Sequence, residues 1–309
     1  MAPNRALVTI TGKAGSSAPA QSAALRGPLE RDTLVDQHLE VEPGRLVAGE
    51  DGLLDVGRKE CQAQDTPVIR GVDRAADIMN GDLTFVVGSP ETDPAGDGSS
   101  ARHIGTLSAG ETDRSLPDWL EALKRERKLI WVYAGNPRYG GPSYTTPFDS
   151  AVVLDAAFST LGNIDVDVVL TMGFQSVPEG HIIPSNFHLA DFLSGPAIAA
   201  RCDVMIHHGG HGSMINGLAA GKPAVIVPTN SERESNARRL ASLGAGEFVL
   251  PTANPGMEKH VDNTAFASAV QRVLSTRSYT EKARQLGERI SRLGGVRAVV
   301  RSVEELAAA

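Results

Sequence analysis

The sequence predicts an α/β protein whose C-terminal part is a doubly wound parallel sheet. From Lys128 onward, short apolar runs alternate with amphipathic helical stretches, the pattern of buried parallel strands joined by crossover helices. Aromatic residues make up only 5% of the 309 residues, while Ala, Gly, Val and Leu dominate. This composition suits helices packed closely on both faces of a sheet, and the 41% of apolar residues can form a sizeable core.

The expected elements follow from this alternation. The apolar runs predict strands over residues 129–135, 166–173, 203–206, 223–228 and 247–251. Helices are predicted over residues 149–161, 191–202, 213–221, 232–246, 264–275 and 279–293. Upstream, Leu83–Val87 and residues 101–107 are predicted strands, and residues 116–127 form a predicted helix with Pro117 in its first turn. The first 75 or so residues are poorly patterned, and their Gly-, Ser-, Ala- and Pro-rich stretches indicate loop or disorder.

Charge and composition exclude several classes of function. The net charge is −7 and no stripe of Lys and Arg stands out, which argues against nucleic-acid binding. Two cysteines, Cys61 and Cys202, show no pairing pattern, so we expect a reducing, cytoplasmic location. The apolar stretch Ala6 to Ile10 is too short for a signal peptide, and no run approaches the roughly 20 apolar residues of a membrane span.

The glycine-rich stretch 207–213 joins a predicted strand to a predicted helix. Glycines at such a turn let backbone N–H groups approach a ligand, and the helix N-terminus adds partial positive charge. The combination favours a phosphate or diphosphate, which His208 could also bind, at the edge where open α/β sheets bind ligands. Ser213 could cap the helix, donate to a phosphate oxygen, or do both.

Other interpretations of this stretch remain open. The spacing fits neither the dinucleotide fingerprint nor a P-loop, and a glycine-rich turn alone is weak evidence for phosphate. His207, His208 and His211 could suggest a metal, but without a second cluster of ligands we expect none. His207 could equally be a core residue.

The stretch 203–246 resembles the signature of the GT-B glycosyltransferases that use UDP- or dTDP-sugars. This family includes macrolide, other antibiotic and erythromycin-type glycosyltransferases. Its diphosphate-binding His-Gly-Gly-x-Gly-Ser/Thr motif matches residues 208–213, and its Gly-x-Pro motif matches residues 221–223. Further along, Pro228, the pair Asn236-Ala237 and the Gly-x-Gly at 244–246 also match. The resemblance implies that the donor diphosphate is bound by the following residues: His208, Gly209, Gly210, Gly212 and Ser213.

The resemblance extends over roughly residues 75–309. It implies a GT-B-type C-terminal domain with a partial N-terminal domain, in which Gly135 and Asn136 line the cleft. Phe192 takes the place of an aromatic that stacks on the base, although a core position is an equal possibility. The implied segments are as follows: 1–75, a partial acceptor domain; 76–127, the end of that domain and the linker; 128–275, the Rossmann-like nucleotide-sugar-binding domain; 276–309, helices that pack back on the domain interface.

The sequence departs from the family pattern at the donor site. Asn216 stands where the family often has a ribose-binding Glu, and the loss of that charge would matter less for a dTDP-sugar. Glu232-Arg233 replaces an Asp-Gln pair that contacts the sugar. A carboxylate is kept, whereas Arg233 could meet a phosphate, an acidic sugar, or only Glu234 and solvent.

A further departure concerns the general base. The family base is a His near the start of the N-terminal domain, but this early segment has only His38, in a different context. The catalytic residues therefore stay unassigned. If the partner domain is absent, the domain-interface face should expose apolar surface and favour self-association.

We expect a hexosyltransferase of secondary metabolism or antibiotic biosynthesis, acting without cofactor or metal on a UDP- or dTDP-sugar and a hydrophobic small-molecule hydroxyl. The alternative is a truncated, non-catalytic nucleotide-sugar-binding protein. A nucleotide-sugar epimerase is a third option, but no carboxylate-rich cleft supports it.

Overall fold

A computed structural model describes residues 8–11, 81–107, 116–123, 126–135, 148–173, 177, 182–253 and 259–308. The chain divides into two compact units. The larger unit includes Phe85–Arg301, and strand β1 (Val8–Thr11) belongs to the smaller one. The rest of the expected partial domain 1–75 lies outside the described residues. Within the described part of the chain, no helix is both long and apolar enough to cross a membrane.

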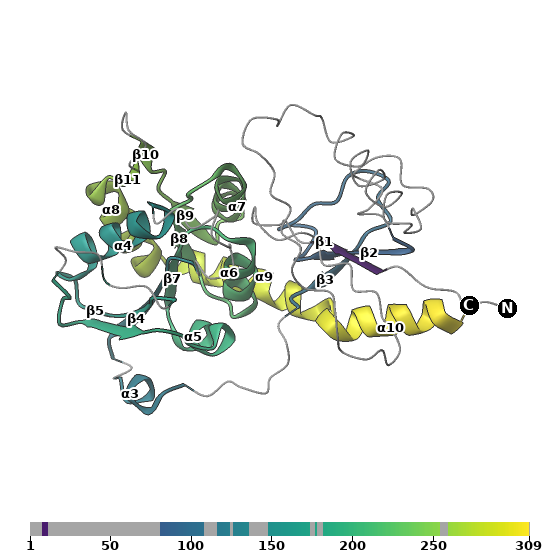
Figure 1. Ribbon diagram of the computed structural model, residues 1–309, viewed down its shortest axis with the longest axis horizontal. Helices are drawn as coiled ribbons and strands as arrows, with labels where there is room; N and C mark the ends of the chain where they lie inside the picture. Colours follow the sequence, from purple (N-terminus) through teal and green to yellow (C-terminus); the bar gives the residue numbers. More distant parts are fainter. Residues whose placement is uncertain are drawn as a thin grey trace, which may run out of the picture. The chain divides into compact units, whose positions relative to one another are not determined.

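The larger unit is built on a six-stranded sheet in which all neighbouring strands are parallel (Figure 1). The strand order is β6-β5-β4-β7-β8-β9, so the direction of winding reverses between β4 and β7. This arrangement confirms the predicted doubly wound fold. The strands are β4 (Lys128–Tyr133), β5 (Val166–Thr171), β6 (Phe187–Ala190), β7 (Val204–His207), β8 (Ala224–Ile226) and β9 (Gly246–Phe248).

Helices cover both faces of this sheet. Along β4, Ile130 and Val132 pack with α4 (Phe148–Leu161) and α8 (Asn263–Ser275). The alternate residues Leu129 and Trp131 share a second core with the helices of the other face. Each strand therefore feeds two cores, which explains its continuous apolar sequence. The helices of the second face are α5 (Gly195–Arg201), α6 (His211–Ala219), α7 (Ser231–Ser242) and α9 (Arg277–Arg292).

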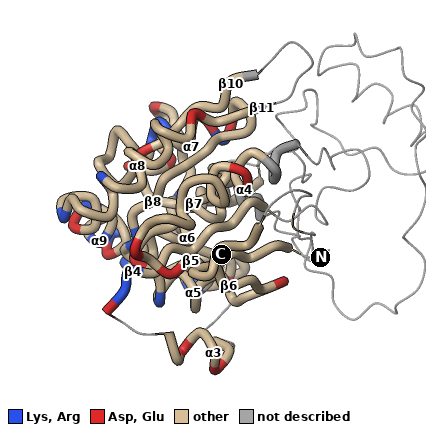
Figure 2. The backbone as a smooth tube through the Cα atoms, turned by 90° about the vertical axis from the view of Figure 1, so that its left-hand side faces the viewer, with Lys and Arg blue, Asp and Glu red and all other residues tan. Residues whose placement is uncertain are grey.

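Smaller elements flank this core. Strand β2 (Leu83–Val87) pairs in parallel with β3 (Arg102–Gly105), and β10 (Thr252–Ala253) pairs antiparallel with β11 (Lys259–His260). Helices α3 (Asp118–Glu121) and α10 (Gly295–Ala308) complete the chain. Acidic and basic residues are intermixed on the outer helices and loops of this unit (Figure 2).

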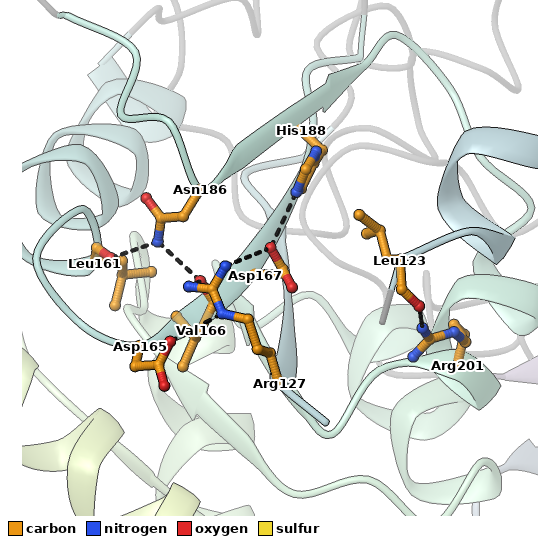
Figure 3. A network of polar contacts seen from close by, with 9 residues as sticks. All are labelled: Leu123, Arg127, Leu161, Asp165, Val166, Asp167, Asn186, His188 and Arg201. Atoms are coloured by element: carbon orange, nitrogen blue, oxygen red, sulfur yellow. Dashed lines mark hydrogen bonds and ion pairs between the residues drawn. The ribbon is translucent and has the colours of Figure 1, made fainter. Parts of the chain in front are cut away.

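A polar network ties the amino ends of β4, β5 and β6 together (Figure 3). Arg127 bonds Asp165 at 2.9 Å and Asp167 at 3.3 Å, and Asp167 also meets Nε2 of His188 at 3.2 Å. The ring of Trp119 in α3 stacks on His188 with centroids 5.9 Å apart. These contacts fix α3 and the start of β4 at the edge opposite to the carboxyl ends of the strands.

Candidate functional site

The candidate site lies at the carboxyl ends of β4 and β7, where the strand order reverses. Tyr133 and His207 are paired at the ends of these strands, and Gly135 and His208 follow them. Gly135 has φ +112°, and a Cβ there would lie 3.4 Å from Cε1 of His208. The Tyr133 and His208 rings meet edge to face at 5.7 Å. This switch point is where doubly wound folds bind ligands. Asn136, expected beside Gly135, lies outside the described residues.

Glycines shape the loop that leads from β7 into α6. Gly209 has φ +92°, and a Cβ there would lie 2.9 Å from the carbonyl oxygen of Arg233, so this position requires glycine. Gly210 is the N-cap of α6 and makes no side-chain capping bond. Within the described part of the chain, a Cβ at Gly212 would meet no neighbouring heavy atom within 4 Å, and this residue is exposed. The first turn of α6 therefore presents backbone N–H groups to open space, the geometry of an anion site.

Ser213 is the third residue of α6, because the helix begins two residues earlier than the sequence indicated. It is partly buried, and Gly210 holds the capping position that Ser213 was considered to fill. The hydroxyl thus lies in the first turn of the helix, beside its N-terminus, where it could donate to an anion.

His207 and His208 are both buried, with 0% and 7% of their surface exposed. Nδ1 of His207 accepts a hydrogen bond of 3.1 Å from the Gly209 N–H, so this core histidine also shapes the loop. Burial lowers the pKa of His207 to about 4. Burial also lowers the pKa of His208 to about 3, and the charge of Arg233 acts in the same direction. Both imidazoles are therefore neutral at pH 7.

His208 keeps an unsatisfied polar atom at the site. Its Nδ1 is buried and has no hydrogen-bond partner within the described part of the chain. A buried polar atom without a partner is costly, and a bound phosphate oxygen or ligand hydroxyl would remove that cost.

The start of α7 forms the second side of the site. Asn236 is fully buried, and its Nδ2 donates to the Gly209 carbonyl at 2.9 Å and to Oε1 of Glu232 at 2.7 Å. Asn230 caps the helix through a 2.9 Å bond from the Arg233 N–H. The Arg233 guanidinium donates through Nη1 to Oγ1 of Thr229, which follows β8. The structure thus brings Glu232, Arg233 and Asn236 together beside the glycine loop.

Two contacts from the segment after β2 reach α6 and were not visible in the sequence. Nε2 of His211 lies 3.1 Å from Oδ1 of Asp93, and both side chains are buried. Oγ1 of Thr106 donates to Oδ1 of Asn216 at 3.2 Å. The partners are separated by 118 and 110 residues, so no local pattern joins them. Asn216 is therefore held by the chain itself, which constrains how it could meet a ribose.

Phe192 follows β6 at the end of the sheet. Its side chain is 68% exposed, so it is not a core residue and is available for stacking. Among the described residues, no group of three or more His, Cys, Asp or Glu side chains is arranged to hold a metal.

Comparison with solved structures defines the fold. The structure aligns with the glycosyltransferase VinC in complex with dTDP at a TM-score of 0.60 and 21% identity, covering 85% of this chain and 61% of that one. The glycosyltransferase SnogD from Streptomyces nogalater aligns at a TM-score of 0.57 and 21% identity, covering 74% and 59%. The fold is that of the GT-B glycosyltransferases.

Sequence comparison also finds glycosyltransferases. Residues 155–306 match the model of the family described as erythromycin biosynthesis protein CIII-like, C-terminal domain. A PGL/p-HBAD biosynthesis glycosyltransferase of Mycobacterium tuberculosis is 27% identical over 219 residues, 71% of this chain and 46% of the relative. The erythronolide mycarosyltransferase of Saccharopolyspora erythraea is 28% identical over 173 residues, 56% of this chain and 38% of the relative. The matched region thus spans less than half the length of these relatives.

Proposed function

We propose that the chain binds a UDP- or dTDP-sugar at the carboxyl edge of its larger sheet and transfers the hexose to a hydroxyl of a hydrophobic small molecule. The observation that carries this proposal is the α6 N-terminus, which opens beside buried His208 at the switch point of the sheet. The N–H groups of this turn and the helix dipole suit a diphosphate. His208 adds a hydrogen bond to the same anion, and no resident cofactor takes part.

The remaining site residues have complementary roles in this proposal. Phe192 stacks on the base, because it presents an exposed ring beyond β6. Asn216, one turn into α6, meets the ribose through its amide, and Glu232 holds hydroxyls of the sugar. The neutral amide of Asn216 binds a hydroxyl less strongly than a carboxylate would, which favours dTDP over UDP.

Calorimetric titration with UDP and with dTDP tests the donor site. The wild-type chain should bind at least one nucleotide with micromolar affinity, and His208→Ala should weaken binding by about 10-fold or more, through loss of a bond to a charged group. His188→Ala is the matched control, because His188 belongs to the polar network near the amino ends of the strands (Figure 3) and not to the donor site. Absence of binding, or equal affinity in wild type and His208→Ala, would contradict the proposal.

The second candidate is a protein that binds the nucleotide sugar without transferring it. This candidate is favoured because the candidate-site residues within the described ranges are all assigned to donor binding. Release of UDP or dTDP from the bound sugar donor, with and without small-molecule acceptors, separates the two candidates. Binding without any release would favour the second.

A further inference from the structure

The donor site presents an electrostatic problem. A nucleoside diphosphate brings a full negative charge on each phosphate, whereas a helix N-terminus supplies only about half of a positive charge. His207 and His208 are buried, and burial lowers the pKa of both, so neither imidazole carries charge at pH 7. A cationic side chain at this edge would supply further compensating charge.

Arg233 stands at the required place. A Cβ on Gly209 would lie 3.0 Å from the Cβ of Arg233, so the arginine is packed directly under the glycine loop. Its Nη1 donates to Oγ1 of Thr229, a buried residue that follows β8. The arginine also acts electrostatically on His208, whose pKa it lowers. The Arg233 side chain is thus close to His208, the residue at the centre of the proposed donor site.

Two further contacts keep Arg233 in this position. The Arg233 N–H is held by the cap Asn230, and Asn236, on the next turn of α7, bonds the Gly209 carbonyl. The helix and the loop are therefore locked together by short polar contacts, with the arginine between them. Lys259 lies at the same edge, where its Nζ donates to the carbonyl oxygen of Thr229.

We propose that Arg233 binds the diphosphate of the donor and supplies positive charge beside the α6 N-terminus. This inference rests on the proposed nucleotide-sugar site and deepens it. A planar guanidinium presents several N–H groups to a phosphate at once and remains charged at any physiological pH. The family pattern has the Gln of its Asp-Gln pair at this position. In this chain the arginine that replaces it then neutralises charge on the leaving diphosphate.

The experiment compares uridine, UMP, UDP and UDP-glucuronate, and the corresponding thymidine series, by calorimetry. Arg233→Gln should weaken binding of the diphosphate by about 10- to 100-fold and leave nucleoside binding unchanged. Arg233→Lys should retain part of the affinity, and added salt should weaken the wild type more than the Gln variant. Arg239→Gln, the same change six residues further along α7, is the control and should behave as wild type.

The outcomes separate this inference from the proposed function. If the wild type binds no nucleotide, both the proposed function and the role of Arg233 are refuted. If the wild type binds and Arg233→Gln binds UDP or dTDP within about twofold of it, only the role of Arg233 is refuted. Equal losses for nucleoside and diphosphate would show a general disturbance of the site and overturn the inference. A loss confined to UDP-glucuronate would assign Arg233 to an acidic sugar instead.

Discussion

Asn236→Ala should uncouple α7 from the glycine loop. Asn236 is fully buried, and one atom, Nδ2, makes both of its bonds, to the Gly209 carbonyl at 2.9 Å and to Oε1 of Glu232 at 2.7 Å. Alanine removes both bonds at once. It leaves the carbonyl and the carboxylate oxygen without this donor in a site that water reaches poorly.

The cost follows from the two bonds. A neutral hydrogen bond contributes about 1 kcal/mol and one to a charged group about 1.5–3 kcal/mol. Their sum predicts a loss of about 2–4 kcal/mol in the free energy of unfolding. For a domain of this size, each kcal/mol lowers the melting temperature by about 2–4 °C. Nucleotide affinity should fall as well, because the Gly209 backbone loses its support.

Urea denaturation and calorimetric titration of the same samples provide the assay. Ser235→Ala, an exposed neighbour on the same helix, serves as control and should change stability by less than about 0.5 kcal/mol. The reasoning is refuted if Asn236→Ala is as stable as the control. A large loss of stability with unchanged nucleotide affinity would show that Asn236 supports α7 but not the loop.

Three further predictions concern the same site. Gly209→Ala places a Cβ 2.9 Å from the Arg233 carbonyl at φ +92°, so it should cost about 1–3 kcal/mol in thermal denaturation, and a wild-type melting temperature would contradict this. The free energy of unfolding should fall as pH drops below about 6.5, by up to about 1.4 kcal/mol per pH unit for each of His207 and His208. The reason is that both histidines take up protons in the unfolded chain, whereas burial lowers their pKa values in the folded chain to about 4 and about 3. Urea titrations at pH 7.5, 5.5 and 4.5 check this, and a flat profile would argue against burial of both. Phe192→Ala should leave the melting temperature unchanged, since the ring is 68% exposed, but weaken nucleotide binding by about 1–3 kcal/mol, and equal affinity would remove Phe192 from the site.

The sheet was predictable because its strands are buried on both sides. The central strands β4, β5 and β7 are almost wholly buried, and their apolar runs are visible in the sequence. Strand β6 was not among the predicted strands, because it lies at the sheet edge and buries only Phe187 fully. The reversal of strand order between β4 and β7 depends on packing between distant segments, which hydrophobic periodicity does not encode.

The site was predictable only where it is local in sequence. The glycine loop and α7 could be placed because their residues follow strands directly. The start of α6 was misplaced by two residues, since Ser213 is a stronger capping signal than Gly210, which makes no side-chain cap. The contacts of His211 with Asp93 and of Asn216 with Thr106 could not be anticipated, because they join segments more than 100 residues apart.

These two contacts join the segment before α3 to α6. The sequence assigns residues 76–127 to the end of the first domain and the linker, and within this segment Asp93 and Thr106 bond α6 directly. The segment also fits closely elsewhere, since a Cβ on Gly105 would lie 2.3 Å from the Ile290 carbonyl in α9. The first turn of α6, where the diphosphate is proposed to bind, is thus braced from within the larger unit. In the proposed reaction, a chain that binds nucleotide but transfers no sugar would place its deficiency on the acceptor side.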